Sequence, residues 1–221
     1  MEKKYLAWAL GFVLMVTALS LVFLYVPTEK TMGDVQRIFY FHVPIAWISL
    51  LAFLVIFISS ILFLWRKEEK WDWLARSSAE IGFIFNTLVL VTGPIWAKPA
   101  WGTWWTWDAR LTTALMLWFI YLAYHLSRSL APEEWRGARF AAVVGIVGFA
   151  DVPIVALAVV LWRTQHPGPV VFEGGLTGSM MLTLIISLVA FTVLYILLLI
   201  YRTRLRQADT ELALIKQARM E

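Results

Sequence analysis

The sequence predicts an all-α polytopic membrane protein, and three observations carry that prediction. Hydrophobic residues make up 61% of the 221 residues. Apolar runs repeatedly reach the length of about 20 residues that a helix needs to cross a bilayer. Charged residues collect in short segments between these runs, so the net charge of +4 does not form one basic face for nucleic acid. The chain has no cysteine, which excludes disulfides and thiolate metal sites.

Six apolar runs are expected to form transmembrane helices. They occupy residues 6–26, 43–65, 77–95, 111–130, 141–161 and 180–201. The first run is longer than the apolar core of a signal peptide, and no small-residue cleavage pattern follows it, so we expect a retained span. No internal repeat or second soluble domain is visible. Residues 1–221 are therefore expected to form a single membrane domain.

The distribution of basic residues predicts how the chain is oriented. Of the 19 Lys and Arg residues, 14 lie in the N-terminal segment, the second and fourth connections and the C-terminal tail. Basic residues favour the cytoplasmic side of a membrane. Both termini are therefore expected in the cytoplasm, and the first, third and fifth connections on the outer side.

The third connection, residues 96–110, is unusually rich in tryptophan. It holds five tryptophans in the twelve residues WAKPAWGTWWTW, more than the aromatic belt of a membrane helix requires. Pro99 suits the first turn of a helix, and Trp101, Trp104 and Trp105 follow at helical spacing. This pattern predicts a short interfacial helix that presents several indoles to a large, flat, mostly apolar ligand.

Two of the three histidines lie in the outer connections. His42 and His166 each stand near a proline, which restricts where the ring can point. Two imidazoles on one side of the membrane could bind the iron of a haem from both faces, although each could also be a hydrated interfacial side chain. His125 lies deep in the fourth span, towards the cytoplasmic side, and is expected to pack near Arg128.

Cations near the same outer surface could hold the two haem propionates. Arg37 and Arg110 are the best placed in the sequence, and Lys30, Lys98 and Arg163 are weaker candidates. Each of these cations could instead meet lipid phosphate. Asp108 would repel a propionate, so we expect it to orient Arg110 or to cap local backbone.

The segment WGTWWTWDARLT resembles the tryptophan-rich signature of the haem-handling membrane proteins of cytochrome c maturation, and within them the haem exporter protein C family. The signature positions are Trp101, Trp104, Trp105, Trp107 and Asp108. The family pattern also has six spans and one histidine in each flanking outer loop, here His42 and His166. Related haem lyase subunits have more spans and a Trp-x-Trp-Asp-Pro-x-Glu ending, which this chain lacks.

The resemblance implies a specific biological setting. It implies transient binding of haem b at the periplasmic face of a bacterial inner membrane and delivery of that haem to a periplasmic haem chaperone. The implied partners are an ATP-binding-cassette ATPase subunit, a second membrane subunit and a small single-span subunit. The chain shows no GxxxxGK[ST] loop, so ATP hydrolysis would belong to another subunit. The implied role is not that of a classical enzyme, and promotion of covalent haem attachment to the chaperone stays open.

Two functions of other classes remain alternatives. Asp151 lies near the middle of the fifth span, where a carboxylate is costly and often functional, and this would suit a proton-coupled secondary transporter. Pro153, two residues later, could break the helix there. The alternative is a structural role, in which Asp151 pairs with a polar group such as Asn86 or Thr92. The second alternative is a structural subunit whose tryptophans dock another membrane protein without haem.

Overall fold

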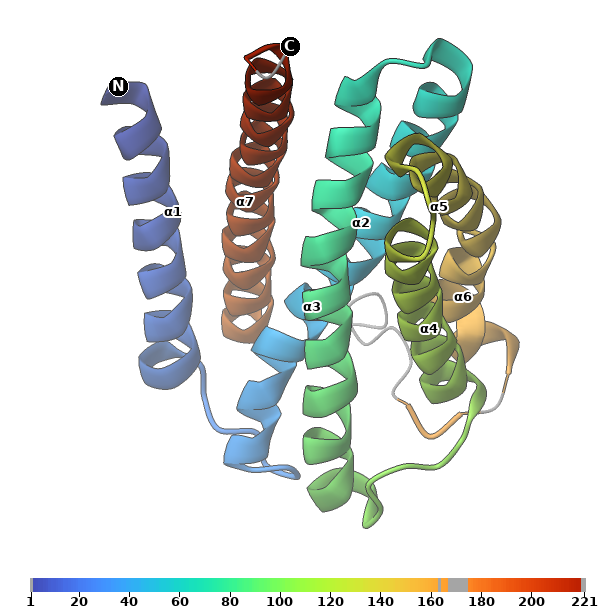
Figure 1. Cartoon of the computed structure of the whole chain (residues 1–221). Helices are drawn as coiled ribbons and strands as arrows, with labels where there is room; N and C mark the ends of the chain where they lie inside the picture. The colour runs from blue at the N-terminus through green and yellow to red at the C-terminus, as the bar shows by residue number, and fades with distance from the viewer. Residues whose placement is uncertain (1, 163, 167–174, 220–221) are drawn as a thin grey trace.

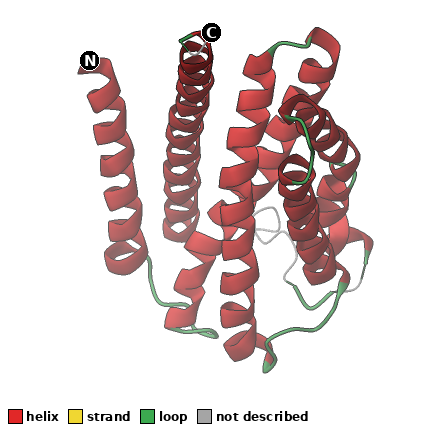
Figure 2. Cartoon of the chain, viewed as in Figure 1, coloured by secondary structure: helices red, strands yellow, loops and turns green. Residues whose placement is uncertain are grey.

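The computed structural model describes residues 2–162, 164–166 and 175–219, and within these residues the protein is a helical bundle without β-strands (Figures 1 and 2). Its main helices are α1 (Glu2–Ser20), α2 (Phe39–Arg66), α3 (Glu69–Trp101), α4 (Ala109–Ser129), α5 (Glu134–Gly148), α6 (Asp151–Leu161) and α7 (Gly178–Ala218). A π-helical turn, η1 (Leu21–Tyr25), and a 3-10 turn, η2 (Asp34–Ile38), join α1 to α2. The two chain ends lie at the same end of the bundle (Figure 1).

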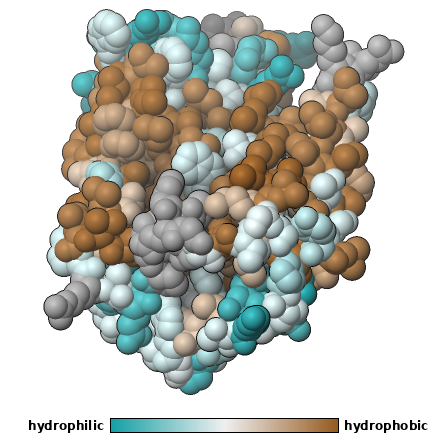
Figure 3. Space-filling view, turned by 180° about the vertical axis from the view of Figure 1, so that it is seen from behind, coloured by the Kyte–Doolittle hydropathy of each residue, from teal (hydrophilic) through white to brown (hydrophobic). Residues whose placement is uncertain are grey.

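Five helical segments of the described chain are long and apolar enough to cross a membrane. They are Tyr5–Tyr25, Asp34–Arg66, Glu69–Trp101, Glu134–Leu161 and Gly178–Ala218. Figure 3 shows apolar side chains across the middle of one face and hydrophilic side chains at both ends. The multi-pass membrane prediction is therefore supported. Helix α4 covers most of the expected fourth span but is not among these five segments, so the count of six spans stays a prediction.

The fifth expected span is broken into two helices. Helix α5 ends at Gly148 and α6 begins at Asp151. Pro153 has no backbone N–H and cannot donate to the carbonyl of Phe149, which favours a break just before it. This is the break that the sequence indicates near Pro153.

The prediction of a short interfacial helix in the tryptophan-rich segment is wrong. Helix α3 instead continues through Pro99 to Trp101, and residues 102–108 form no helix. Gly102 ends α3 in the left-handed conformation, with φ 78°, and its N–H donates to the carbonyl of Lys98. Trp107 also has a positive φ of 56°, which a helix cannot accommodate. The segment is therefore an irregular loop that ends where Asp108 caps α4.

Helices α2, α3 and α4 pack closely near the middle of the bundle. Gly82 of α3 allows this approach, because a Cβ there would lie 2.8 Å from Cβ of Ala52 and would also clash with Tyr121. The hydroxyl of Tyr121 is fully buried and donates to the carbonyl of Ser49 at 2.7 Å. This contact fixes α4 against α2 and so helps to shape the cavity described below.

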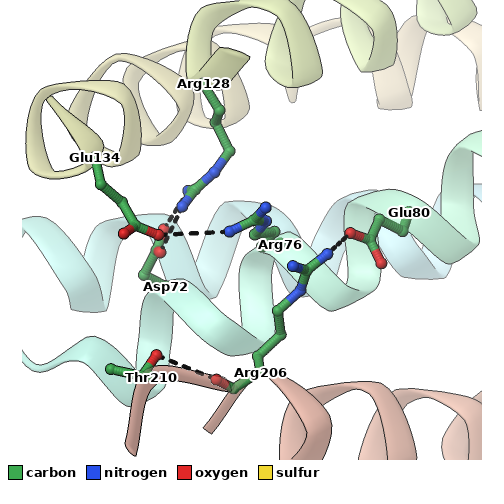
Figure 4. A network of polar contacts seen from close by, with 7 residues as sticks. All are labelled: Asp72, Arg76, Glu80, Arg128, Glu134, Arg206 and Thr210. Carbon is green, nitrogen blue, oxygen red and sulfur yellow. Dashed lines mark hydrogen bonds and ion pairs between the residues drawn. The ribbon is translucent and has the colours of Figure 1, made fainter. Parts of the chain in front are cut away.

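A network of charged side chains joins four helices near the end of the bundle where both chain termini lie. Figure 4 shows this network from close by. Arg128 of α4 binds both carboxylate oxygens of Asp72 on α3, at 2.5 and 2.8 Å. Glu80 of α3 accepts hydrogen bonds from Arg202 and Arg206 of α7. Arg76 is 3.6 Å from Glu134 of α5. These bonds connect α3 to α4, α5 and α7.

Candidate functional site

A cavity lies toward the other end of the bundle, between α2, α3, α4 and α6 and the loops that adjoin them. Most of its walls are aliphatic or aromatic. The side chains with polar or aromatic chemistry that line it are His42, Ser49, Asn86, Trp96, Trp101, Trp105, Arg110 and His166.

His42 enters the cavity from the first turns of α2. Its side chain is buried, at 7% exposure. The ring Nδ1 lies 2.8 Å from the hydroxyl of Thr92 on α3, and the ring lies 5.9 Å from the ring of Trp96. The imidazole thus has a polar contact with Thr92 and a ring contact with Trp96, both on α3.

His166 enters the same cavity from the connection after α6. Its ring meets that of Trp101 edge to face, with 6.4 Å between centroids. Its backbone N–H donates to the hydroxyl of Thr164 at 3.1 Å. The chain thus brings together two histidines that are 124 positions apart in the sequence, calculated as 166 minus 42.

Asp108 links the tryptophan-rich loop to the segment that carries His166. Its Oδ1 accepts from the N–H of Leu111 and caps α4, while Oδ2 accepts from Thr106 and from the N–H of Gln165 at 3.3 Å. Burial is the largest influence and raises the pKa of Asp108, but these bonds and one from Thr164 outweigh it and lower the pKa below 3.8. The capping role expected from the sequence is confirmed.

The tryptophans divide into two groups. Trp101 and Trp105 line the cavity, whereas Trp104 and Trp107 are 57% and 70% exposed. Trp96, which precedes them on α3, also lines the cavity. The indole N–H groups of Trp96 and Trp105 are buried and have no hydrogen-bond partner among the described residues. Buried donors of this kind are costly unless a partner is supplied, so a ligand with acceptor oxygens would suit the cavity.

Of the two favoured cations, Arg110 lines the cavity and Arg37 does not. Arg110 also donates to the carbonyl of Val155. The guanidinium of Arg37 binds the carbonyl of Val22 and the carboxylate of Asp34, and so holds the connection between α1 and α2. The contact of Arg37 with a propionate stays a prediction.

Two of the weaker cation candidates, Lys30 and Lys98, do not line this cavity in the described structure. Lys98 donates to the carbonyl of Gly102 and thereby closes the end of α3. Lys30 is an exposed residue in the connection between α1 and α2. Arg163 lies outside the described residues.

His125 is separate from the two cavity histidines. Its ring packs edge to face on Phe83, 5.6 Å between centroids, and lines a different, polar cavity with Arg76, Glu80 and Arg128. This agrees with the structural role expected for it near Arg128.

Two contributors to the site were missed from sequence. Trp96 belongs to the tryptophan-rich segment, and its place at the start of that segment was the available signal. Thr92 gives no such signal, because its contact with His42 depends on how α2 and α3 align across 50 residues.

The fold and the site together define a class of protein. It is a multi-pass helical membrane protein with two histidines and three tryptophans around one cavity. The sequence profile of the family described as "Heme exporter protein C" matches residues 2–217. The chain is 36% identical over 200 residues to the heme exporter protein C of Bradyrhizobium diazoefficiens, covering 88% of this chain and 76% of that protein. It is 31% identical over 180 residues to the Escherichia coli (strain K12) protein of the same name, covering 81% and 74%.

A third relative is a ccmC-like mitochondrial protein of cytochrome c biosynthesis from Marchantia polymorpha. It is 39% identical over 166 residues, which cover 74% of this chain and 70% of that protein. The chain therefore belongs to the heme exporter protein C family.

Proposed function

We propose that this protein handles haem during the biogenesis of c-type cytochromes and holds it in the cavity between α2, α3, α4 and α6. The observation that carries the proposal is the convergence of His42 and His166 on one cavity with indole walls. The names of the relatives give the same setting, since they are called heme exporters or cytochrome c biosynthesis proteins.

The residues of the cavity fit haem as a cargo. Imidazoles are ordinary axial ligands of haem iron, and His42 and His166 would supply them. Trp101 and Trp105 offer flat apolar surface to the macrocycle. Arg110 would bind a propionate, because a guanidinium pairs well with a carboxylate.

The exposed tryptophans suggest where a partner would approach. Trp104 and Trp107 lie beside the cavity-lining residues but face outward, and exposed aromatic residues are frequent at protein interfaces. In this proposal they meet the periplasmic chaperone that receives haem. An ATP-binding-cassette ATPase, a second membrane subunit and a small single-span subunit complete the proposed complex.

The proposed location is the bacterial inner membrane, with the cavity toward the periplasm. Support comes from the concentration of basic residues near the termini and the even connections. The tryptophan-rich loop lies at the end of the bundle opposite both termini (Figure 1), as this orientation requires.

The proposal is tested by the haem absorbance of the purified protein. His42→Ala and His166→Ala should each weaken the absorbance band, because each removes one iron ligand. His125→Ala is the matched control and should leave the band unchanged, since His125 lines a different cavity. Equal loss in all three variants, or in none, would reject the assignment.

A proton-coupled transporter is the second candidate, and a specific observation favours it. Asp151 is buried at 6% exposure where α5 and α6 meet, and its Oδ2 has no hydrogen-bond partner in the described structure. The suggested partners are engaged elsewhere, since Asn86 donates to the carbonyl of Ala114 and Thr92 contacts His42. Asp151→Asn should leave haem absorbance intact if haem handling is the function, whereas loss of proton-driven solute uptake in vesicles would favour the transporter.

A simpler observation distinguishes a docking subunit that binds no haem from the haem-handling and transporter functions. A colourless preparation that still binds its membrane partner would support docking alone.

A further inference from the structure

The hydrogen bonds around Thr92 determine which nitrogen of His42 carries a proton. Thr92 lies on α3, and its hydroxyl oxygen makes two short contacts. One is with the carbonyl oxygen of Leu88, one helical turn earlier, at 2.7 Å. The other is with Nδ1 of His42 on α2, at 2.8 Å.

Counting hydrogens gives the direction of both bonds. A threonine hydroxyl has one hydrogen, and a carbonyl oxygen can only accept. The hydrogen of Thr92 therefore goes to Leu88, so the hydrogen in the second bond must come from Nδ1 of His42. A neutral imidazole carries one N–H. The neutral ring is the form that can bind a metal, and in it that single hydrogen occupies Nδ1. Nε2 consequently keeps its lone pair.

A neighbouring threonine shows the same arrangement with an unambiguous donor. Thr87 of α3 donates to the carbonyl of Phe83 at 2.8 Å and accepts from the indole N–H of Trp118 at 2.9 Å. An indole nitrogen can only donate. The α3 backbone thus orients both hydroxyls as acceptors for a ring on an adjacent helix.

The position of the ring is fixed as well as its tautomer. Cε1 of His42 lies against Gly93, where an added Cβ would be 3.5 Å away, and the ring of Trp96 lies 5.9 Å from that of His42. The Nδ1 edge therefore faces α3.

We infer that Thr92 is a positioning residue that holds His42 as the Nδ1–H tautomer and thereby presents an unprotonated Nε2 as the iron-binding nitrogen. The ligand role of His42 rests on the proposed function. Metal-binding histidines usually donate their other N–H to a partner that fixes tautomer and orientation. A hydroxyl partner increases the basicity of the imidazole less than a carboxylate would, which suits a cargo that must later be released.

The tautomer is measured first without haem, in the full-length protein in lipid nanodiscs with ¹⁵N-labelled histidine. Nitrogen chemical shifts should show His42 with a protonated Nδ1 and an unprotonated Nε2. Thr92→Val keeps the shape but removes the acceptor, so the proton should redistribute toward Nε2. Thr92→Ser should preserve the wild-type pattern, and Thr87→Val is the matched control on the same helix.

Haem titration of the same four proteins provides the second measurement. Thr92→Val should lower haem affinity by at least about tenfold, as loss of such a partner does at other metal sites. Thr92→Ser and Thr87→Val should bind as wild type does.

The two measurements separate failure of this inference from failure of the proposed function. A protonated Nε2 on wild-type His42, or a tautomer unchanged in Thr92→Val, would overturn the inference. Absence of haem binding in every protein, with the tautomer pattern as expected, would instead overturn the proposed function.

Discussion

At the scale of single residues, Asp108 has the widest influence on the candidate site. One oxygen caps α4 and the other holds Thr106 and the backbone of Gln165. The tryptophan-rich loop and the connection bearing His166 are thus joined through one carboxylate. Asp108 therefore positions the cavity walls.

Two substitutions separate the two tasks of Asp108. Asparagine is about as good an N-cap as aspartate, whereas alanine costs about 1 kcal/mol. Asp108→Asn should therefore keep the thermal stability of the protein but weaken haem binding, because its amide NH₂ cannot accept from Gln165. Asp108→Ala should lower both. Thermal unfolding and haem titration of the two variants measure this, and unchanged haem affinity in both would contradict the positioning role.

The same carboxylate predicts a pH dependence. Its pKa is lowered below 3.8 in the folded protein, so its stabilising bonds are fully present above 3.8 and are lost as the pH falls through the lower folded value. The amide resonance of Gln165 should stay constant down to pH 3.8 and shift below it. The resonance in Asp108→Asn should already have the shifted position at neutral pH. A wild-type shift that occurs well above pH 3.8 would argue against this linkage.

At the scale of elements, the close approach of α2 and α3 depends on a glycine. A side chain at position 82 would meet Ala52 and Tyr121, and overfilling a packed core costs about 1–3 kcal/mol. Gly82→Ala should therefore lower the thermal unfolding temperature. Gly178→Ala is the matched control, because nothing lies within 4 Å of a Cβ there. Equal unfolding temperatures for the two variants would show that the helices can separate without cost.

Element boundaries also show what the sequence could and could not predict. The apolar runs predicted the helical membrane fold, and Pro153 indicated the break between α5 and α6. The interfacial helix failed because Trp101, Trp104 and Trp105 have helical spacing, yet Gly102 ends α3 between them. Spacing alone does not show whether a glycine continues a helix or terminates it.

At the scale of the whole molecule, loop location predicted more of the site than any local pattern did. His42, His166 and Arg110 lie in or beside connections assigned to one side of the membrane, and the structure brings all three to one cavity. Specific contacts between helices could not be predicted from the sequence. Thr92 on His42 and Arg206 on Glu80 each depend on the alignment of helices distant in sequence.

The central claim is that His42 and His166 bind one iron from its two faces. Electron paramagnetic resonance of the protein loaded with ferric haem tests it most directly. The wild-type protein and His125→Ala should give the low-spin signal of iron with two imidazole ligands. His42→Ala and His166→Ala should each convert it to a high-spin signal, whereas a low-spin signal that persists in both single variants would contradict the account.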